Sequence, residues 1–197
     1  MNNTEILEKF DPVPLREIIL ASASPRRASL LQNAGFVSLK IMIPHVKETD
    51  DPIENARLKA EEIAGACPEA IVVGADTVIR LNNRIIGKPT DLNDARTILT
   101  DLSGRTHEVS TGVCVRCVAD EVLVRFEETT KVTFRKLTPT AIDRYLKNVN
   151  VLDKAGAYAI QEHGEDLIST IEGSFTNVIG LPVERLTETL HYLLNTP

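Results

Sequence analysis

The stretch from residue 18 to residue 35 constrains the fold most, because it predicts a buried strand that continues directly into a helix. The apolar run Ile18–Leu20 is typical of a strand with both faces covered. Ser24 and Pro25 then supply an N-cap residue followed by proline at the first helical position. Gly35 stands where the glycine that ends a helix belongs. A strand joined to a helix in this way favours an α/β fold.

The turn between that strand and that helix carries two serines and two arginines: Ser22, Ser24, Arg26 and Arg27. A helix N-terminus offers unpaired backbone N–H groups and a partial positive charge, to which hydroxyl and guanidinium donors are added here. Such a turn suits a multiply charged anion, above all a phosphate. Taken alone, however, it is more typical of an ordinary helix start with solvated arginines.

The remainder of the chain predicts further alternation of strands and helices, with a long hairpin in the middle. Strands are expected at residues 36–43, 70–81, 84–86, 109–118, 121–137 and 167–171, and residues 157–161 suit either a buried strand or a cleft wall. Helices are expected from residue 52, over 91–102, from 139 and over 183–194, and residues 173–177 suggest a tight polar loop. We therefore predict an α/β fold with a mixed twisted sheet, flanking helices and two lobes around a deep cleft. Residues 18–197 form a single domain in this prediction, and residues 1–17 form a loosely ordered leader.

Charge and cysteine content limit the classes of partner. The net charge of −6 argues against a general nucleic-acid binder, although a local basic cluster could still bind a triphosphate. No apolar stretch is long enough to span a bilayer, and the N-terminus has no signal-peptide layout. Three cysteines without export signals indicate free thiols in the cytoplasm. Cys114 and Cys117 are predicted to face opposite sides of one strand as core residues, and the histidines show no zinc-ligand spacing.

Asp76 is the sharpest single-residue signal in the sequence, because it interrupts the most apolar of the predicted strands. A carboxylate in such a place is costly unless it is paired, hydrogen-bonded or bound to a metal. Gly74 and Ala75, directly before it, leave room for another group to approach closely. We therefore favour a functional role for Asp76.

Further acids and cations extend the candidate set. Glu48 lies in a polar loop, and Lys59 lies at the edge of a helical apolar stripe, where spacing alone favours a surface lysine. Lys88 follows Gly87 in a turn that is not a phosphate-binding loop of the Walker type. The sequence favours equally a lysine that contacts phosphate and an ordinary turn lysine. Gln161 has an amide that could pair with a base edge or remain solvated. Together with the serines and arginines, these residues suit a nucleoside triphosphate with a divalent metal.

The motif from Ser22 to Arg27 resembles the signature of the Maf family, the nucleoside triphosphate pyrophosphatases associated with septum formation. Further motifs are similar to those of the family and follow in its order: residues 56–60, 74–77, 87–89, 102–109, 111–113, 152–158, 160–161, 173–174 and 177–182. The resemblance extends from residue 18 to the last predicted helix. It implies the fold of inosine triphosphate pyrophosphatases.

The resemblance also implies roles for the candidate residues. It implies hydrolysis between the α- and β-phosphates, with Asp76 as the proton acceptor and Glu48 and Asp76 beside a divalent cation, Mg²⁺ or alternatively Mn²⁺. Lys59 and Lys88 would act on the phosphates during catalysis. The substrate-binding residues implied in the same way are Ser22, Ser24, Arg26 and Arg27.

Three residues carry the implied substrate choice. Arg27, Thr77 and Gln161 match the branch of the family that acts on dTTP and UTP, whereas Glu162 stands where the family often has glycine. The alternatives are the same fold acting on a modified purine such as N7-methylguanosine triphosphate, and a nucleotide-binding regulator of septum formation with weak turnover. The expected partner is a nucleoside triphosphate, without nucleic acid or membrane, and a symmetric homodimer is the default expectation.

Overall fold

The computed structural model describes residues 16–195, which confirm the mixed α/β fold and contain a seven-stranded sheet. The sheet order is β2-β1-β3-β5-β6-β7, and β4 pairs with β3 off this path. The strands are β1 (Ile18–Ala21), β2 (Leu39–Met42), β3 (Ile71–Leu81), β4 (Arg84–Ile86), β5 (Thr106–Cys117), β6 (Val122–Phe134) and β7 (Ile168–Glu172). The helices are α1 (Pro25–Asn33), α2 (Pro52–Ala66), α3 (Leu92–Leu102), α4 (Pro139–Asn148), the 3₁₀ turn η1 (Ala155–Ala157), α5 (Gly164–Leu167), α6 (Phe175–Ile179) and α7 (Val183–Asn195).

The sheet is mixed because its two halves are connected differently. β1 pairs in parallel with β2 and β3, since helices α1 and α2 provide the crossovers between these strands. The later pairs, β3 with β4 and β5, β5 with β6, and β6 with β7, are antiparallel. The turn between β3 and β4 uses Asn82 and Asn83 at φ of 51° and 64°, a left-handed geometry that asparagine tolerates.

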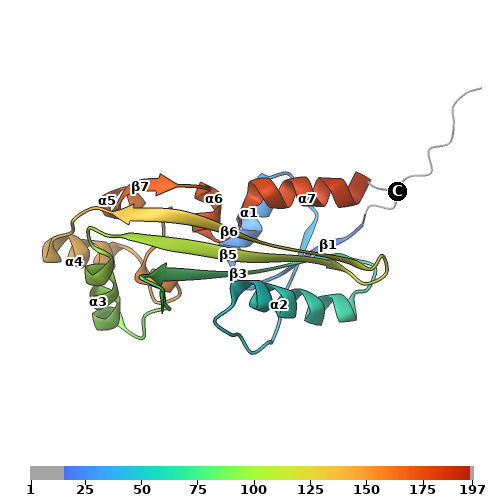
Figure 1. The fold of residues 1–197 in the computed structure, drawn as a ribbon, viewed down its shortest axis with the longest axis horizontal. Coiled ribbons are helices and arrows are strands. Elements are labelled where there is room, and N and C mark those ends of the chain that lie inside the picture. The colour runs from blue at the N-terminus through green and yellow to red at the C-terminus, as the bar shows by residue number, and fades with distance from the viewer. Residues whose placement is uncertain (1–15, 196–197) are drawn as a thin grey trace, which may run out of the picture.

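Helices cover both faces of the sheet, as Figure 1 shows, with β3, β5 and β6 running along the long axis of the molecule. At the end near the C-terminus, α2 lies on one face and α1 and α7 lie on the other. A separate apolar core lies at the other end, where α3 and α4 pack. Cys114 belongs to the core under α2 and Cys117 to the core under α7, which confirms that the two thiols face opposite sides of β5.

Helix α2 rests directly on the sheet at two glycines. Gly74 in β3 and Gly112 in β5 lie beneath it, and Asp76 is the register partner of Gly112. A Cβ atom on Gly74 would lie 2.2 Å from the carbonyl oxygen of Ala56, and one on Gly112 would lie 2.4 Å from that of Pro52. The group that approaches closely at Gly74 is therefore the backbone of helix α2.

Two local predictions are corrected, and one open alternative is decided. The strand expected over 36–43 is shorter, because the N–H groups of Phe36 and Val37 bond back to Leu31 and Gly35 in closing helix α1. Residues 157–161 form a cleft wall rather than a strand, since Ala157 adopts a positive φ and a turn follows. The loop expected over 173–177 instead begins α6, whose N-cap is Ser174.

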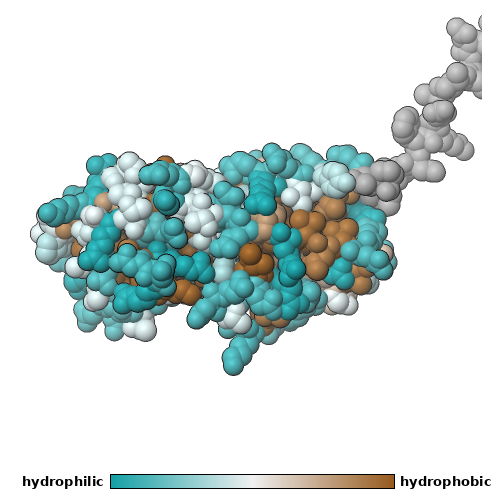
Figure 2. All heavy atoms as spheres, in the orientation of Figure 1, coloured by the Kyte–Doolittle hydropathy of each residue, from teal (hydrophilic) through white to brown (hydrophobic). Residues whose placement is uncertain are grey.

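The predicted leader of residues 1–17 lies almost entirely outside the described residues. Its last two residues are attached to the body: Arg16 forms an ion pair with Asp120, and the carbonyl of Glu17 accepts a hydrogen bond from Ile71 N–H. Figure 2 shows a visible face that is mostly hydrophilic, with hydrophobic residues gathered mainly where β1 lies in Figure 1. Within residues 16–195, no helix combines the length and apolar character that crossing a membrane requires.

Candidate active site

A cavity of about 620 Å³ lies between the two halves of the described molecule and confirms the expected cleft. All ten candidate residues from the sequence line it: Ser22, Ser24, Arg26, Arg27, Glu48, Lys59, Asp76, Thr77, Lys88 and Gln161. They come from the β1–α1 turn, the first turn of α1, the loop before α2, α2 itself, β3, the segment after β4 and the loop after η1. The tertiary structure therefore collects in one place what the sequence disperses over 140 residues.

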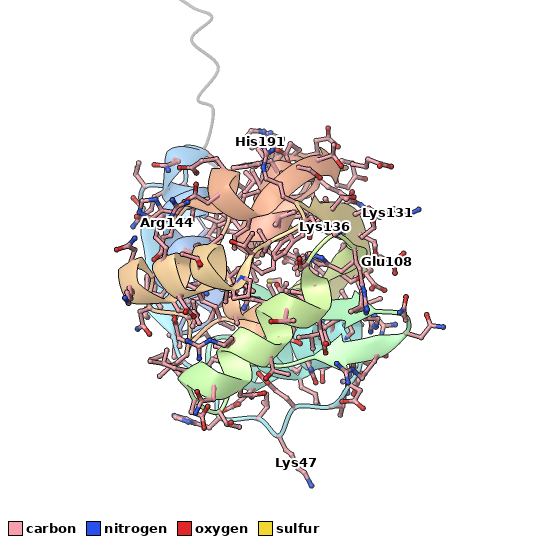
Figure 3. The ribbon with its side chains drawn as sticks, turned by 90° about the vertical axis from the view of Figure 1, so that its left-hand side faces the viewer. Lys47, Glu108, Lys131, Lys136, Arg144 and His191 are labelled. Carbon is pink, nitrogen blue, oxygen red and sulfur yellow. The ribbon has the colours of Figure 1, made fainter. Side chains whose placement is uncertain are left out.

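Asp76 and Glu48 are joined by Lys59. The Lys59 ammonium Nζ lies 2.7 Å from Asp76 Oδ1 and 2.6 Å from Glu48 Oε1. Lys59 is only 8% exposed, so the surface position that its spacing favoured is wrong. Figure 3 shows Lys47, the neighbour of Glu48, pointing away from the body.

Arg27 ties together three elements beside Asp76. Its Nε donates to the Gly180 carbonyl at 2.8 Å. Its Nη1 donates to the Ala75 carbonyl at 2.9 Å and to Ser22 Oγ at 3.2 Å, and its Nη2 donates to Thr77 Oγ1 at 2.9 Å. Burial lowers the pKa of this guanidinium, opposed by the nearby Asp76 charge. Most of the donors are thus used within the protein, and Arg27 shapes the cavity wall on either side of Asp76.

Arg26 and Ser24 have polar groups closer to the open space of the cavity. Arg26 Nη1 reaches across to Asp153 Oδ2 at 3.3 Å. Partial burial raises the pKa of Asp153, but hydrogen bonds from Lys154 and Arg26 outweigh it and hold that pKa below its usual value. Ser24 occupies the N-cap position of α1 without making a side-chain capping bond, which leaves its hydroxyl free to meet a ligand.

The cavity differs in polarity from one part to another. Lys88 and Gln161 are exposed at its rim, whereas apolar side chains line another part of its wall. These are Ile79, Ile85, Ile86, Val109, Tyr158, Ala159, Ile160, Val178 and Ile179. A cavity with cations and acids in one part and apolar side chains in another suits a ligand that has both a charged chain and a flat ring.

Tyr158, which belongs to this apolar wall, pairs with the buried His107, a pair that the sequence did not predict. Tyr158 Oη and His107 Nε2 are 2.8 Å apart, and both rings meet Phe134 edge to face. Burial lowers the pKa of His107 to about 4 and raises the pKa of Tyr158 above its usual value. The imidazole is therefore neutral at pH 7.

The buried His107 should make the protein less stable in mild acid. The unfolded chain binds a proton near pH 6.5 and the folded chain only near pH 4, so stability falls as pH decreases through this interval. Between pH 7 and pH 5 the loss from this residue should be about 2 kcal/mol. Urea unfolding at both pH values should show that loss in the parent and a correspondingly smaller one in His107→Gln. Equal losses in the two proteins would refute the assignment, and His45→Gln at an exposed position controls for removing an imidazole.

Sequence reasoning missed other cavity residues besides Tyr158. Asn55 lies four residues before Lys59 and therefore on the same helix face, a spacing that could have indicated it. Asp153 and Lys154 lie in a recognised motif, but only the fold brings Asp153 to Arg26. Lys154 is buried and pairs with Asp153 at 2.9 Å and with Glu162 at 3.4 Å. Glu162, at the position where the family often has glycine, thus belongs to this ion-pair network.

The carboxylates of Glu48 and Asp76 have the ligand chemistry that a magnesium ion prefers. Among the residues described, no group of three or more His, Cys, Asp and Glu side chains is arranged to hold a metal. Glu48 and Asp76 nevertheless offer oxygens on either side of the Lys59 ammonium, at a point already suited to positive charge. Mg²⁺ is commonly held by one or two carboxylates together with phosphate oxygens and water.

The chain has an α/β fold like that of the Ham1 protein, with a cavity between its two halves. The Ham1 protein of Staphylococcus aureus aligns with a TM-score of 0.55 at 18% identity, over 90% of this chain and 100% of that one. Residues 17–193 match the family described as Maf-like protein, and the chain belongs to the Maf family. It is 42% identical over 184 residues to a protein of Bacillus cereus named dTTP/UTP pyrophosphatase, covering 89% of this chain and 95% of that protein. A protein of the same name from Akkermansia muciniphila is also 42% identical over 184 residues, covering 89% and 96%.

Proposed function

We propose that this chain is a dTTP/UTP pyrophosphatase, which hydrolyses the nucleoside triphosphate to the monophosphate and pyrophosphate. The observation that carries the proposal is the Glu48–Lys59–Asp76 cluster inside a cavity with an apolar part. The relatives named dTTP/UTP pyrophosphatase support the same substrate class. The sequence similarity to these relatives extends over most of both chains, so we propose the activity for the chain as a whole.

Asp76 is the proton acceptor in this proposal. Water attacks one phosphorus atom of the α–β anhydride, the bond to the bridging oxygen breaks, and the proton of the water passes to Asp76. Lys59, Lys88 and Arg26 offset the charge of the triphosphate and of the departing pyrophosphate, while Ser22 and Ser24 belong to the binding turn. Glu48 and Asp76 would hold Mg²⁺, or alternatively Mn²⁺. When bound, the metal supplies charge neutralisation and orientation of the phosphates.

Arg27, Thr77 and Gln161 are the residues proposed to select the base. Arg27 acts by positioning, because it holds Thr77 Oγ1, which also lies 3.0 Å from Thr111 Oγ1. Gln161 at the rim offers both donors and an acceptor, as a pyrimidine edge requires. The three free cysteines are consistent with a cytoplasmic location, which we propose together with a symmetric homodimer as the default assembly.

A substrate panel tests the proposal. With Mg²⁺, the protein should release pyrophosphate from dTTP and UTP faster than from other nucleoside triphosphates. Pyrophosphate and orthophosphate are measured separately, and omission of the metal should stop turnover. Release of orthophosphate alone would refute cleavage at the α–β bond. A preference for N7-methylguanosine triphosphate would refute the proposed branch, and tight nucleotide binding without turnover would favour a nucleotide-binding regulator.

A further inference from the structure

Asn55 is a buried amide in the cleft that lies on the same face of α2 as Lys59. It is 1% exposed, and it precedes Lys59 by one helical turn. Both side chains reach Asp76 from the same side, since α2 lies directly over β3 at Gly74. A buried amide requires partners for its donors and its acceptor, so its contacts define what it does.

The backbone of Thr49 fixes the orientation of this amide. Thr49 N–H donates to Asn55 Oδ1 at 2.7 Å, and Asn55 Nδ2 donates to the Thr49 carbonyl at 2.8 Å. A backbone N–H can only donate and a carbonyl can only accept, so the oxygen and nitrogen of the amide cannot be exchanged. The second N–H of Asn55 Nδ2 is consequently left for Asp76 Oδ2, at 2.9 Å.

Two side chains therefore hold the Asp76 carboxylate, and each donates to one of its oxygens. Lys59 Nζ lies at Oδ1 and Asn55 Nδ2 at Oδ2, which prevents the carboxylate from rotating about its Cβ–Cγ bond. Thr49 is the neighbour of Glu48, so the same amide also anchors the loop that carries the second acid. Asn55 thus links the position of Glu48 to that of Asp76.

We propose that Asn55 is a positioning residue for hydrolysis, which keeps Asp76 and the Glu48 loop in one fixed arrangement. The proposal rests on the proton-accepting role of Asp76 proposed above. A proton acceptor has to meet the attacking water at a set distance and angle, and small displacements of such groups reduce rates strongly. The effect of Asn55 should therefore fall on kcat, with little effect on nucleotide binding.

The experiment compares Asn55→Ala with Asp51→Ala in the full chain. Asp51 caps the same helix by accepting from the N–H groups of Ile53 and Glu54, but it is exposed and lies outside the cavity lining. Asn55→Ala should lower kcat for dTTP by about 10- to 100-fold and change KM by less than about threefold. Asp51→Ala should lower the unfolding temperature and keep kcat within about threefold of the parent.

Binding provides a readout besides turnover. Calorimetry with α,β-methylene-dUTP and Mg²⁺, an uncleavable substrate analogue, should give a Kd for Asn55→Ala within about threefold of the parent. Asn55→Asp keeps the shape but has no N–H to offer Asp76, so its kcat should be no higher than that of Asn55→Ala. The proposal is overturned if Asn55→Asp turns over like the parent, or if Asn55→Ala loses no more activity than Asp51→Ala. It is also overturned if Asn55→Ala no longer binds the uncleavable analogue.

Asp76→Asn separates this inference from the function on which it rests. If Asp76→Asn keeps its turnover, the role of Asp76 fails, and the reason for positioning it fails too. If Asp76→Asn is inactive and Asn55→Ala behaves like Asp51→Ala, only the inference about Asn55 fails.

Discussion

Replacing Asp76 with asparagine is expected to reduce turnover of dTTP by about 10²- to 10⁴-fold, the range that a positioned general base contributes. The amide has nearly the same shape as the carboxylate and can still accept a hydrogen bond from Lys59, but it cannot take a proton from water at neutral pH. The residue is 9% exposed and lies in the middle of β3, so the fold around it should persist. Steady-state release of pyrophosphate measures the loss.

Binding and a matched variant complete this prediction. The uncleavable analogue α,β-methylene-dUTP should still bind Asp76→Asn, because the phosphate-facing cations remain. Asp101→Asn is the control: it removes a half-buried carboxylate that pairs with Arg84 at 3.1 Å and lies outside the cleft. Its turnover should equal that of the parent. Activity of Asp76→Asn within about tenfold of the parent would remove Asp76 from the role of proton acceptor.

Local signals in the sequence were sufficient for the order and type of the main elements. Asp51 followed by Pro52 predicts the start of α2, where the Asp51 carboxylate accepts from two backbone N–H groups. The paired asparagines predict the β3–β4 turn, and the cost of a carboxylate in an apolar strand identifies Asp76. Short elements such as α6 were not predicted, because five residues with a serine cap resemble a polar loop.

The contacts of the site depend on residues that are distant in the sequence. The sequence predicts that Arg27 binds substrate, but it does not predict that the guanidinium meets Ala75, Thr77 and Gly180, at separations of 48, 50 and 153 residues. The sequence predicts a surface position for Lys59, because the apolar stripe of a helix defines only the direction of each side chain. It does not define how far the helix lies from the sheet. That distance is determined by the glycines beneath α2, which no helical pattern reveals.

Gly74→Ala should therefore both destabilise the protein and impair the site. The added Cβ would lie 2.2 Å from the Ala56 carbonyl oxygen and 2.9 Å from the Ala60 nitrogen, both backbone atoms that cannot turn aside. The helix has to move away from β3, at a cost of about 3 kcal/mol or more. The same movement withdraws Asn55 and Lys59 from Asp76, so that the folded fraction should also turn over more slowly than the parent.

Gly65→Ala distinguishes this clash from the general effect of adding a methyl group to a glycine. Gly65 lies in α2 itself, and a Cβ there meets nothing within 4 Å. That substitution should stabilise the protein by about 0.5–1 kcal/mol, because alanine is the better helix former, and it should leave turnover unchanged. Urea unfolding and dTTP turnover measure both variants. If Gly74→Ala unfolds at the same urea concentration as the parent, α2 does not rest on β3 at this point, and the close packing that delivers Asn55 and Lys59 to Asp76 is refuted.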